Sequence, residues 1–162
     1  MAKVTIMLAC AAGMSTSLLV TKMQKAAEDK GLDAEIFAVP APEAEEIVAT
    51  KEVNVLLLGP QVRYLLGDFQ EKLKDRQIPV AVIPMTDYGM MNGSKVLDLA
   101  DANAALLQAH KAQTEMLTRE AQGEETSISL LMVHAQDHLM TSLTFVDLAK
   151  EVVEVYERFE KN

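Results

Sequence analysis

Four short apolar runs without alternating polar positions place the strongest constraint on the fold of this chain. They are residues 3–9, 34–39, 53–59 and 78–84. A strand that is apolar on both faces belongs in a sheet that is covered on both sides. The segments between the runs have charged outer faces and are predicted to be helices, over residues 15–30, 42–51 and 61–75. Because strands and helices alternate with short connections, the pattern predicts a parallel α/β sheet with right-handed crossovers.

The second half of the chain has a different pattern. Residues 94–121 contain no glycine or proline, and Leu and Ala recur there at helical spacing. Gly123 stands where a helix C-cap is expected. A second long helix is predicted to follow, with Thr126 or Ser127 as its N-cap. Two long helices around one break form a helical hairpin.

Together the two patterns predict an α/β domain over residues 1–100 and a two-helix hairpin over residues 101–162. The net charge of −9 argues against binding to nucleic acid and to anionic membranes, since both need basic surface. One cysteine cannot form an internal disulfide, which fits a reducing compartment. No run approaches the roughly 18 apolar residues that span a bilayer. We therefore expect a cytoplasmic protein.

The cysteine opens a loop of small and hydroxyl-bearing residues directly after the first apolar run. In open α/β sheets, ligands bind outside the carboxyl ends of the strands, where backbone N–H groups and the next helix attract anions. Small side chains let a phosphate approach the backbone, and the field favours a thiolate nucleophile at Cys10. The predicted phosphate-binding residues are Ala11, Ala12, Gly13, Met14, Ser15, Thr16 and Ser17.

Two other readings of this loop stay open. A cysteine at the end of a strand is often a core residue and nothing more. A small cysteine phosphatase is the other reading, but Thr16 stands where a tyrosine phosphatase loop has its phosphate-clamping arginine. Without that guanidinium, the transition state of hydrolysis is difficult to stabilise. A loop that accepts a phosphoryl group and hydrolyses it poorly suits a carrier.

A second group of polar residues lies in LLMVHAQDHLMTSL, residues 130–143. Their spacing places them on one face of a helix, and they are His134, Asp137, His138 and Thr141. His and Asp one turn apart suit a metal ion, but a third protein ligand requires several chains to converge. The alternative is a polar stripe inside a helical bundle.

The first half resembles the IIB component of the lactose/cellobiose/chitobiose family of the bacterial sugar phosphotransferase system. The similar stretches are CAAGMSTSLLVTKM at residues 10–23, VNVLLLGPQVRYLL at 53–66 and YGMMNG at 88–93. The resemblance implies a four-stranded parallel sheet flanked by helices. It also implies that a IIA protein phosphorylates Cys10, which passes the group to a sugar held by the membrane component IIC. Gln61 and Tyr64 are assigned a minor role near the loop.

The second half resembles the C-terminal part of the IIA component of the same family, in LLQAHKAQTEML and SLLMVHAQDHLMTSL. Those proteins are trimers of three-helix units, and the resemblance implies that His134 is phosphorylated. Asp137 is similar to the aspartate that meets its symmetry mates at the trimer axis, where a divalent ion can neutralise the cluster. His138 is read as the neighbouring family histidine, and His110 and Gln113 as residues that border the site. One whole IIA helix and the start of a second have no counterpart here.

We therefore expect a phosphocarrier that needs no organic cofactor and passes a phosphoryl group to a disaccharide at IIC. The donor to Cys10 is either His134 or a separate IIA, and the phosphocarrier protein HPr would load an active His134. One alternative is a regulatory or binding module that uses a IIB-like domain as a phosphorylation sensor. Another is that the helical half only holds an oligomer together, without phosphoryl traffic.

Overall fold

The structure is a computed structural model of the 162-residue chain, and it describes residues 3–11, 14–124 and 129–159. The chain divides into two compact units, residues 1–107 and residues 108–162. Helix α5 (Gly93–Ala121) contributes residues to both units. The domain boundary predicted between residues 100 and 101 falls inside this helix and stays a prediction.

The first unit contains a four-stranded parallel sheet with the strand order β2-β1-β3-β4. The strands are β1 (Val4–Cys10), β2 (Ala34–Pro40), β3 (Val55–Leu58) and β4 (Val80–Val82). The predicted parallel α/β fold is confirmed. β4 is shorter than the predicted run because Pro79 and Pro84, on either side of it, have no N–H to donate to a neighbouring strand.

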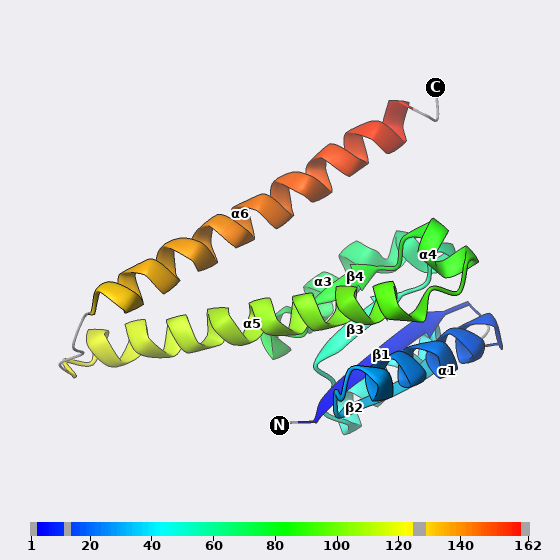
Figure 1. Ribbon diagram of the computed structural model, residues 1–162, viewed down its shortest axis with the longest axis horizontal. Helices are drawn as coiled ribbons and strands as arrows, with labels where there is room; N and C mark the ends of the chain where they lie inside the picture. Colours follow the sequence, from blue (N-terminus) through cyan, green and yellow to red (C-terminus); the bar gives the residue numbers. More distant parts are fainter. Residues whose placement is uncertain (1–2, 12–13, 125–128, 160–162) are drawn as a thin grey trace. The chain divides into compact units, whose positions relative to one another are not determined.

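Helices cover both faces of the sheet (Figure 1). They are α1 (Met14–Asp29), α2 (Ala44–Thr50), α3 (Leu66–Leu73), α4 (Met85–Gly89) and the first part of α5, with 3-10 turns η1 (Ala41–Glu43), η2 (Pro60–Leu65) and η3 (Lys74–Arg76). α1 and α5 pack on one face, and α2 and α3 pack on the other. The sequence patterns did not predict α4, a helix of five residues that begins three residues after the last residue of β4.

The central strand β1 supplies side chains to the cores on both faces. Ile6 and Leu8 pack with residues of α1 and α5, whereas Met7 and Ala9 pack with residues of α2 and α3. All four side chains are buried. This two-sided burial explains why the run has no alternating polar positions.

The C-terminal region is helical, as predicted, and consists of α5 and α6 (Leu130–Phe159). Gly123 follows α5 with φ of +85° and donates its N–H to a carbonyl of the last turn at 2.9 Å, which confirms it as the C-cap glycine. The predicted N-caps Thr126 and Ser127 lie outside the described residues. Ser129 Oγ accepts the Met132 N–H at 3.1 Å and caps α6. Within the described ranges, no helix is long and apolar enough to cross a membrane.

The first residue of α5 touches the backbone of α1. A Cβ placed on Gly93 would lie 2.4 Å from the carbonyl carbon of Lys22 and 2.6 Å from the backbone nitrogen of Met23. Backbone atoms cannot turn aside as the end of a side chain can. The two helices therefore approach this closely only because residue 93 has no side chain.

We expect Gly93→Ala to destabilise the first unit by about 3 kcal/mol, since the helices must separate to admit the methyl group. The control is Gly67→Ala in α3, where no atom lies within 4 Å of the added Cβ. That variant should be neutral or more stable by about 0.5–1 kcal/mol, because Ala favours a helix more than Gly does. Urea unfolding followed by circular dichroism measures both changes. Equal stability of the two variants would contradict the packing argument.

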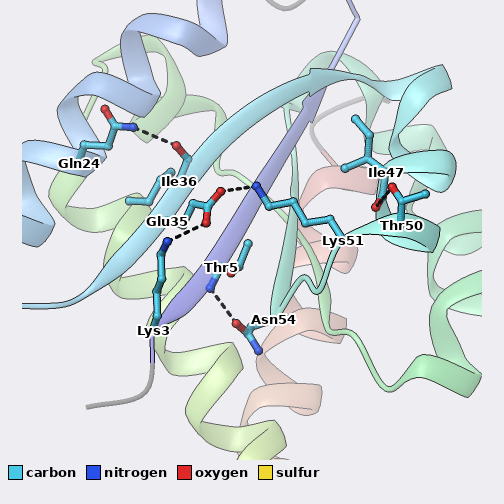
Figure 2. Close-up of polar contacts among 9 residues, drawn as sticks. All are labelled: Lys3, Thr5, Gln24, Glu35, Ile36, Ile47, Thr50, Lys51 and Asn54. Carbon is cyan, nitrogen blue, oxygen red and sulfur yellow. Dashed lines mark hydrogen bonds and ion pairs between the residues drawn. The ribbon is translucent and has the colours of Figure 1, made fainter.

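A group of polar contacts surrounds Glu35 on the edge strand β2 (Figure 2). Its carboxylate lies 2.9 Å from Lys3 Nζ and forms a second ion pair with Lys51. Lys51 Nζ also lies 4.2 Å from the centre of the Phe37 ring. Hydrogen bonds from Lys51 and then from Lys3 lower the pKa of Glu35 below its ordinary value of 4.5.

Replacing Lys51 by Met should raise the pKa of Glu35 toward 4.5, because the largest contribution to its lowering is removed. A titration of the carboxyl carbon by NMR measures this change, with the exposed Lys25→Met as control. Because the pKa of Glu35 is lowered in the folded state, its stabilising contribution is present above the unfolded pKa. That contribution is lost as the pH falls through the folded value. An unchanged midpoint in Lys51→Met would show that this ion pair does not form.

Candidate functional site

Cys10 is the last residue of β1 and lies at the carboxyl edge of the sheet, with its side chain buried. In the sheet, β2 lies on one side of β1, and β3 lies on the other. The chain thus changes direction across β1, and open α/β sheets bind ligands at the strand ends where this change occurs. We call this place, at the carboxyl ends of β1 and β3, the crevice. The predicted nucleophile is located at this crevice.

The predicted phosphate-binding residues are described to different extents. Ala12 and Gly13 lie outside the described residues. Met14 and Ser15 are the first two residues of α1, and only their backbone is described. Ala11 and Ser17 are exposed. The N–H groups of the first turn of α1 have no partner within the helix, so this end of α1 attracts an anion near Cys10.

Among the predicted phosphate-binding residues whose burial is described, Thr16 differs from Ala11 and Ser17 because it is fully buried. Its hydroxyl lies 3.4 Å from the hydroxyl of Tyr88 in α4, and Tyr88 is also buried. This contact joins the first turn of α1 to the helix that follows β4. Sequence reasoning did not find the pair, because the two residues are 72 positions apart and share no periodic pattern.

The turn after β3 forms the other side of the crevice. The Gly59 N–H donates to the Ala9 carbonyl at 2.8 Å, which holds the ends of β1 and β3 together. A Cβ on Gly59 would lie 3.5 Å from Cys10 Cβ and 2.8 Å from Gln61 Oε1. The structure therefore brings Gln61, which the sequence assigned only a minor role, to the same small space as Cys10.

The exposed large apolar side chains described in the first unit lie in the segments that follow β1, β3 and β4. In the described part of the first unit, the large apolar residues that are exposed all follow the carboxyl end of a strand, and we call them the apolar rim: Leu18, Tyr64, Met85 and Met90. Tyr64 also lines a cavity of about 380 Å³ together with Ala11 and Phe69. Exposed apolar side chains of this size suit the docking of a protein.

In the second unit, α6 presents the predicted polar residues to solvent. The exposed residues are His134, Asp137, His138 and Thr141. The rings of His134 and His138 meet edge to face, with centroids 4.3 Å apart. Among the residues described, no group of three or more His, Cys, Asp or Glu side chains is arranged to hold a metal ion. The divalent ion predicted at Asp137 in an oligomer stays a prediction.

The two predicted border residues on α5 differ in exposure. His110 is exposed, whereas Gln113 is half-buried and its Nε2 lies 3.8 Å from Met140 Sδ on α6. Gln113 Oε1 is buried and accepts no hydrogen bond within the described ranges. Gln113 is thus a contact between the two helices of this unit.

α6 also carries an apolar stripe that faces away from its half-buried side. The stripe follows heptad spacing, and its exposed apolar members, which we call the α6 seam, are Leu131, Phe145, Leu148, Val152, Val155 and Phe159. His134, His138 and Thr141 occupy the remaining positions of the same repeat. The half-buried Met132, Leu139 and Leu143 lie on the opposite side of the helix. Such a repeat is typical of helices that associate as a coiled coil.

The first unit has close relatives among known proteins. The family described as "PTS system, Lactose/Cellobiose specific IIB subunit" matches residues 5–99. The cellobiose-specific EIIB component of Lactococcus lactis subsp. lactis is 52% identical over 104 residues, which are 62% of this chain and 96% of that protein. The solution structure of a cellobiose-specific IIB component from Borrelia burgdorferi is similar, with a TM-score of 0.54 and 39% identity, over 64% of this chain and 94% of that one.

The helical region has relatives of a second kind. The family described as "PTS system, Lactose/Cellobiose specific IIA subunit" matches residues 92–157. The lichenan-specific phosphotransferase enzyme IIA component of Bacillus subtilis is 53% identical over 60 residues, which are 37% of this chain and 54% of that protein. The two family matches overlap at residues 92–99, where α5 begins. The chain belongs to the lactose/cellobiose-specific family of the phosphotransferase system, as a IIB-type phosphotransfer component that continues into a IIA-type helical part.

Proposed function

We propose that this protein carries phosphoryl groups on Cys10 within the cytoplasm. It accepts them from a phosphohistidine of a IIA protein and donates them to a disaccharide of the cellobiose, lactose or chitobiose class, bound to the membrane component IIC. The observation that carries this proposal is the location of Cys10, at the crevice between β1 and β3 and directly before the N-terminus of α1. An anion on the sulfur is stabilised by that helix end.

Each transfer exchanges one bond to phosphorus for another. In the first step the Cys10 thiolate attacks phosphorus, the S–P bond forms, and the P–N bond breaks with its electron pair going to the imidazole nitrogen. In the second step a sugar hydroxyl attacks phosphorus, the S–P bond breaks and the thiolate leaves, while the hydroxyl proton passes to a base. The carrier must bind the phosphoryl group weakly enough to release it.

The surroundings of Cys10 favour a carrier over a phosphatase. Thr16 occupies the place of the phosphatase arginine, and its hydroxyl faces Tyr88 in the core. A hydrolytic transition state would therefore lack a guanidinium from this position. The apolar rim, in the segments after β1, β3 and β4, suits protein partners, as expected of a protein that receives its phosphoryl group from IIA and delivers it to IIC.

The helical part is proposed to act as the IIA of the same system, with His134 loaded by HPr. His134 is exposed, so a partner can reach its ring nitrogens. We further propose that α6 joins copies of the chain, as a trimer, through the apolar residues of the α6 seam and the adjacent Asp137. In this arrangement the ring of His134 lies at the edge of the interface, where HPr reaches it. Asp137 side chains would approach one another, and a divalent cation would reduce their repulsion. The exposed seam equally supports the second candidate function, an oligomerisation element without phosphoryl transfer.

The carrier proposal predicts a phosphate adduct in intact-mass spectrometry after incubation with phosphoenolpyruvate, enzyme I and HPr, without a separate IIA. Wild type is compared with Cys10→Ser and His134→Ala at mildly alkaline pH, which preserves phosphohistidine. We expect His134→Ala to abolish the adduct, because the relay then has no entry point. We expect Cys10→Ser to keep only phosphohistidine.

A second arm of the same measurement adds a complete IIA. An adduct that appears only in this arm and is lost in Cys10→Ser would assign the helical part to oligomerisation alone. If Cys10 carries no phosphate in either arm, the carrier function is wrong.

The oligomer proposal predicts that a charge in the α6 seam weakens self-association by about 100-fold, since a carboxylate would be buried at the interface. The test variant is Phe145→Glu, and the matched control is Val133→Glu, an exposed apolar residue of α6 outside the seam. Sedimentation velocity over a range of concentrations measures the change. A wild-type chain that stays monomeric at all concentrations, or equal weakening by both variants, would contradict the proposed interface.

A further inference from the structure

A space beside Cys10 is kept open by Gly59. A Cβ on Gly59 would lie 3.5 Å from Cys10 Cβ and 2.8 Å from Gln61 Oε1. The side chains of Cys10 and Gln61 thus reach the same point, one from the end of β1 and the other from the turn after β3. Cys10 Cβ and Gln61 Oε1 are therefore no further apart than the sum of these two distances. A phosphoryl group on the Cys10 sulfur is attached two bonds from Cβ, within reach of this point.

Backbone hydrogen bonds hold the turn that presents Gln61. The Gly59 N–H donates to the Ala9 carbonyl at 2.8 Å, and the Val62 N–H donates to the Gly59 carbonyl at 3.0 Å. Pro60 restricts the backbone between them. Gln61 lies inside this closed turn, and its side chain is exposed. The backbone therefore fixes where Gln61 stands relative to Cys10, while the amide can still turn.

A carboxamide has the chemistry that a carried phosphoryl group needs. The carbonyl and amino ends of Gln have nearly the same shape, so a half-turn of the amide brings Nε2 to the place of Oε1. From there the N–H can donate to a phosphoryl oxygen. A neutral donor stabilises the group less than an arginine would, and the group must leave again for the sugar.

We propose that Gln61 binds the transferred phosphoryl group, by donating a hydrogen bond from Nε2 to a phosphoryl oxygen while the group is on Cys10. This inference rests on the proposed function, because it requires that Cys10 is phosphorylated. Helix α1 approaches the phosphoryl group from the β1 side of the crevice, and Gln61 approaches it from the β3 side. Gly59 leaves the room that this contact requires, and Gln61 itself forms no covalent bond.

The test uses the full chain and compares Gln61→Met with wild type. Met keeps the length of the side chain and removes the donor. The matched control is Gln70→Met, an exposed glutamine of α3. Cys10 is loaded with phosphoenolpyruvate, enzyme I, HPr and a complete IIA. The rate of loading is followed by quenched-flow mass spectrometry, and the phosphocysteine is observed by ³¹P NMR.

We expect Gln61→Met to load about 10–100-fold more slowly than wild type and to shift the ³¹P resonance, because one hydrogen bond to a charged group is lost. Gln61→Glu should be slower still, since its carboxylate repels the phosphoryl oxygens. Gln70→Met should match wild type in both measurements.

Three outcomes would overturn the inference, and they can be told apart. Equal rates and resonances in Gln61→Met and wild type would leave the carrier function intact and remove Gln61 from the site. Slower loading with an unchanged ³¹P resonance would assign Gln61 to partner docking instead. A wild-type chain that is not phosphorylated on Cys10 would overturn the proposed function itself.

Discussion

The pairing of β1 between β2 and β3 is the constraint on which the rest of the first unit depends. β1 pairs with β2 along its whole length, and residues Ile6–Ala9 also pair with β3. Its side chains enter the cores on both faces, so the strand can neither slide nor turn over without exposing apolar surface. This fixed strand ends at Cys10. The position of the Cys10 sulfur is therefore set by a strand that is paired on both sides and buried along most of its length.

Helix α5 joins the two parts of the chain without a linker. Its first turns bury Val96, Leu97 and Ala100 in the core of the first unit, and Gly93 allows it to touch the backbone of α1. The same helix continues into the second unit, where Gln113 contacts Met140 of α6. One helix therefore completes a IIB-type core and also begins a IIA-type part, in agreement with the overlap of the two family matches.

The two units bury their apolar residues to different extents. The first unit has two cores, and in the residues described there only the four side chains of the apolar rim are large, apolar and exposed. α6 instead exposes apolar residues along most of its length. A helix with an apolar stripe on each side needs two packing partners, and α5 is only one of them. Self-association is the physical explanation that we favour.

The sequence by itself determined the parallel α/β fold, the two long helices and the location of Cys10 at the end of a strand. These features follow from local patterns: apolar runs of strand length, helical spacing, and Gly123 as a helix cap. Only the tertiary structure decided which side chains meet at the crevice. Gln61 reaches the space beside Cys10, and Thr16 meets Tyr88, because strand order brings distant loops to one edge of the sheet. Periodicity describes which face of an element is buried, but it does not describe which element lies next to it.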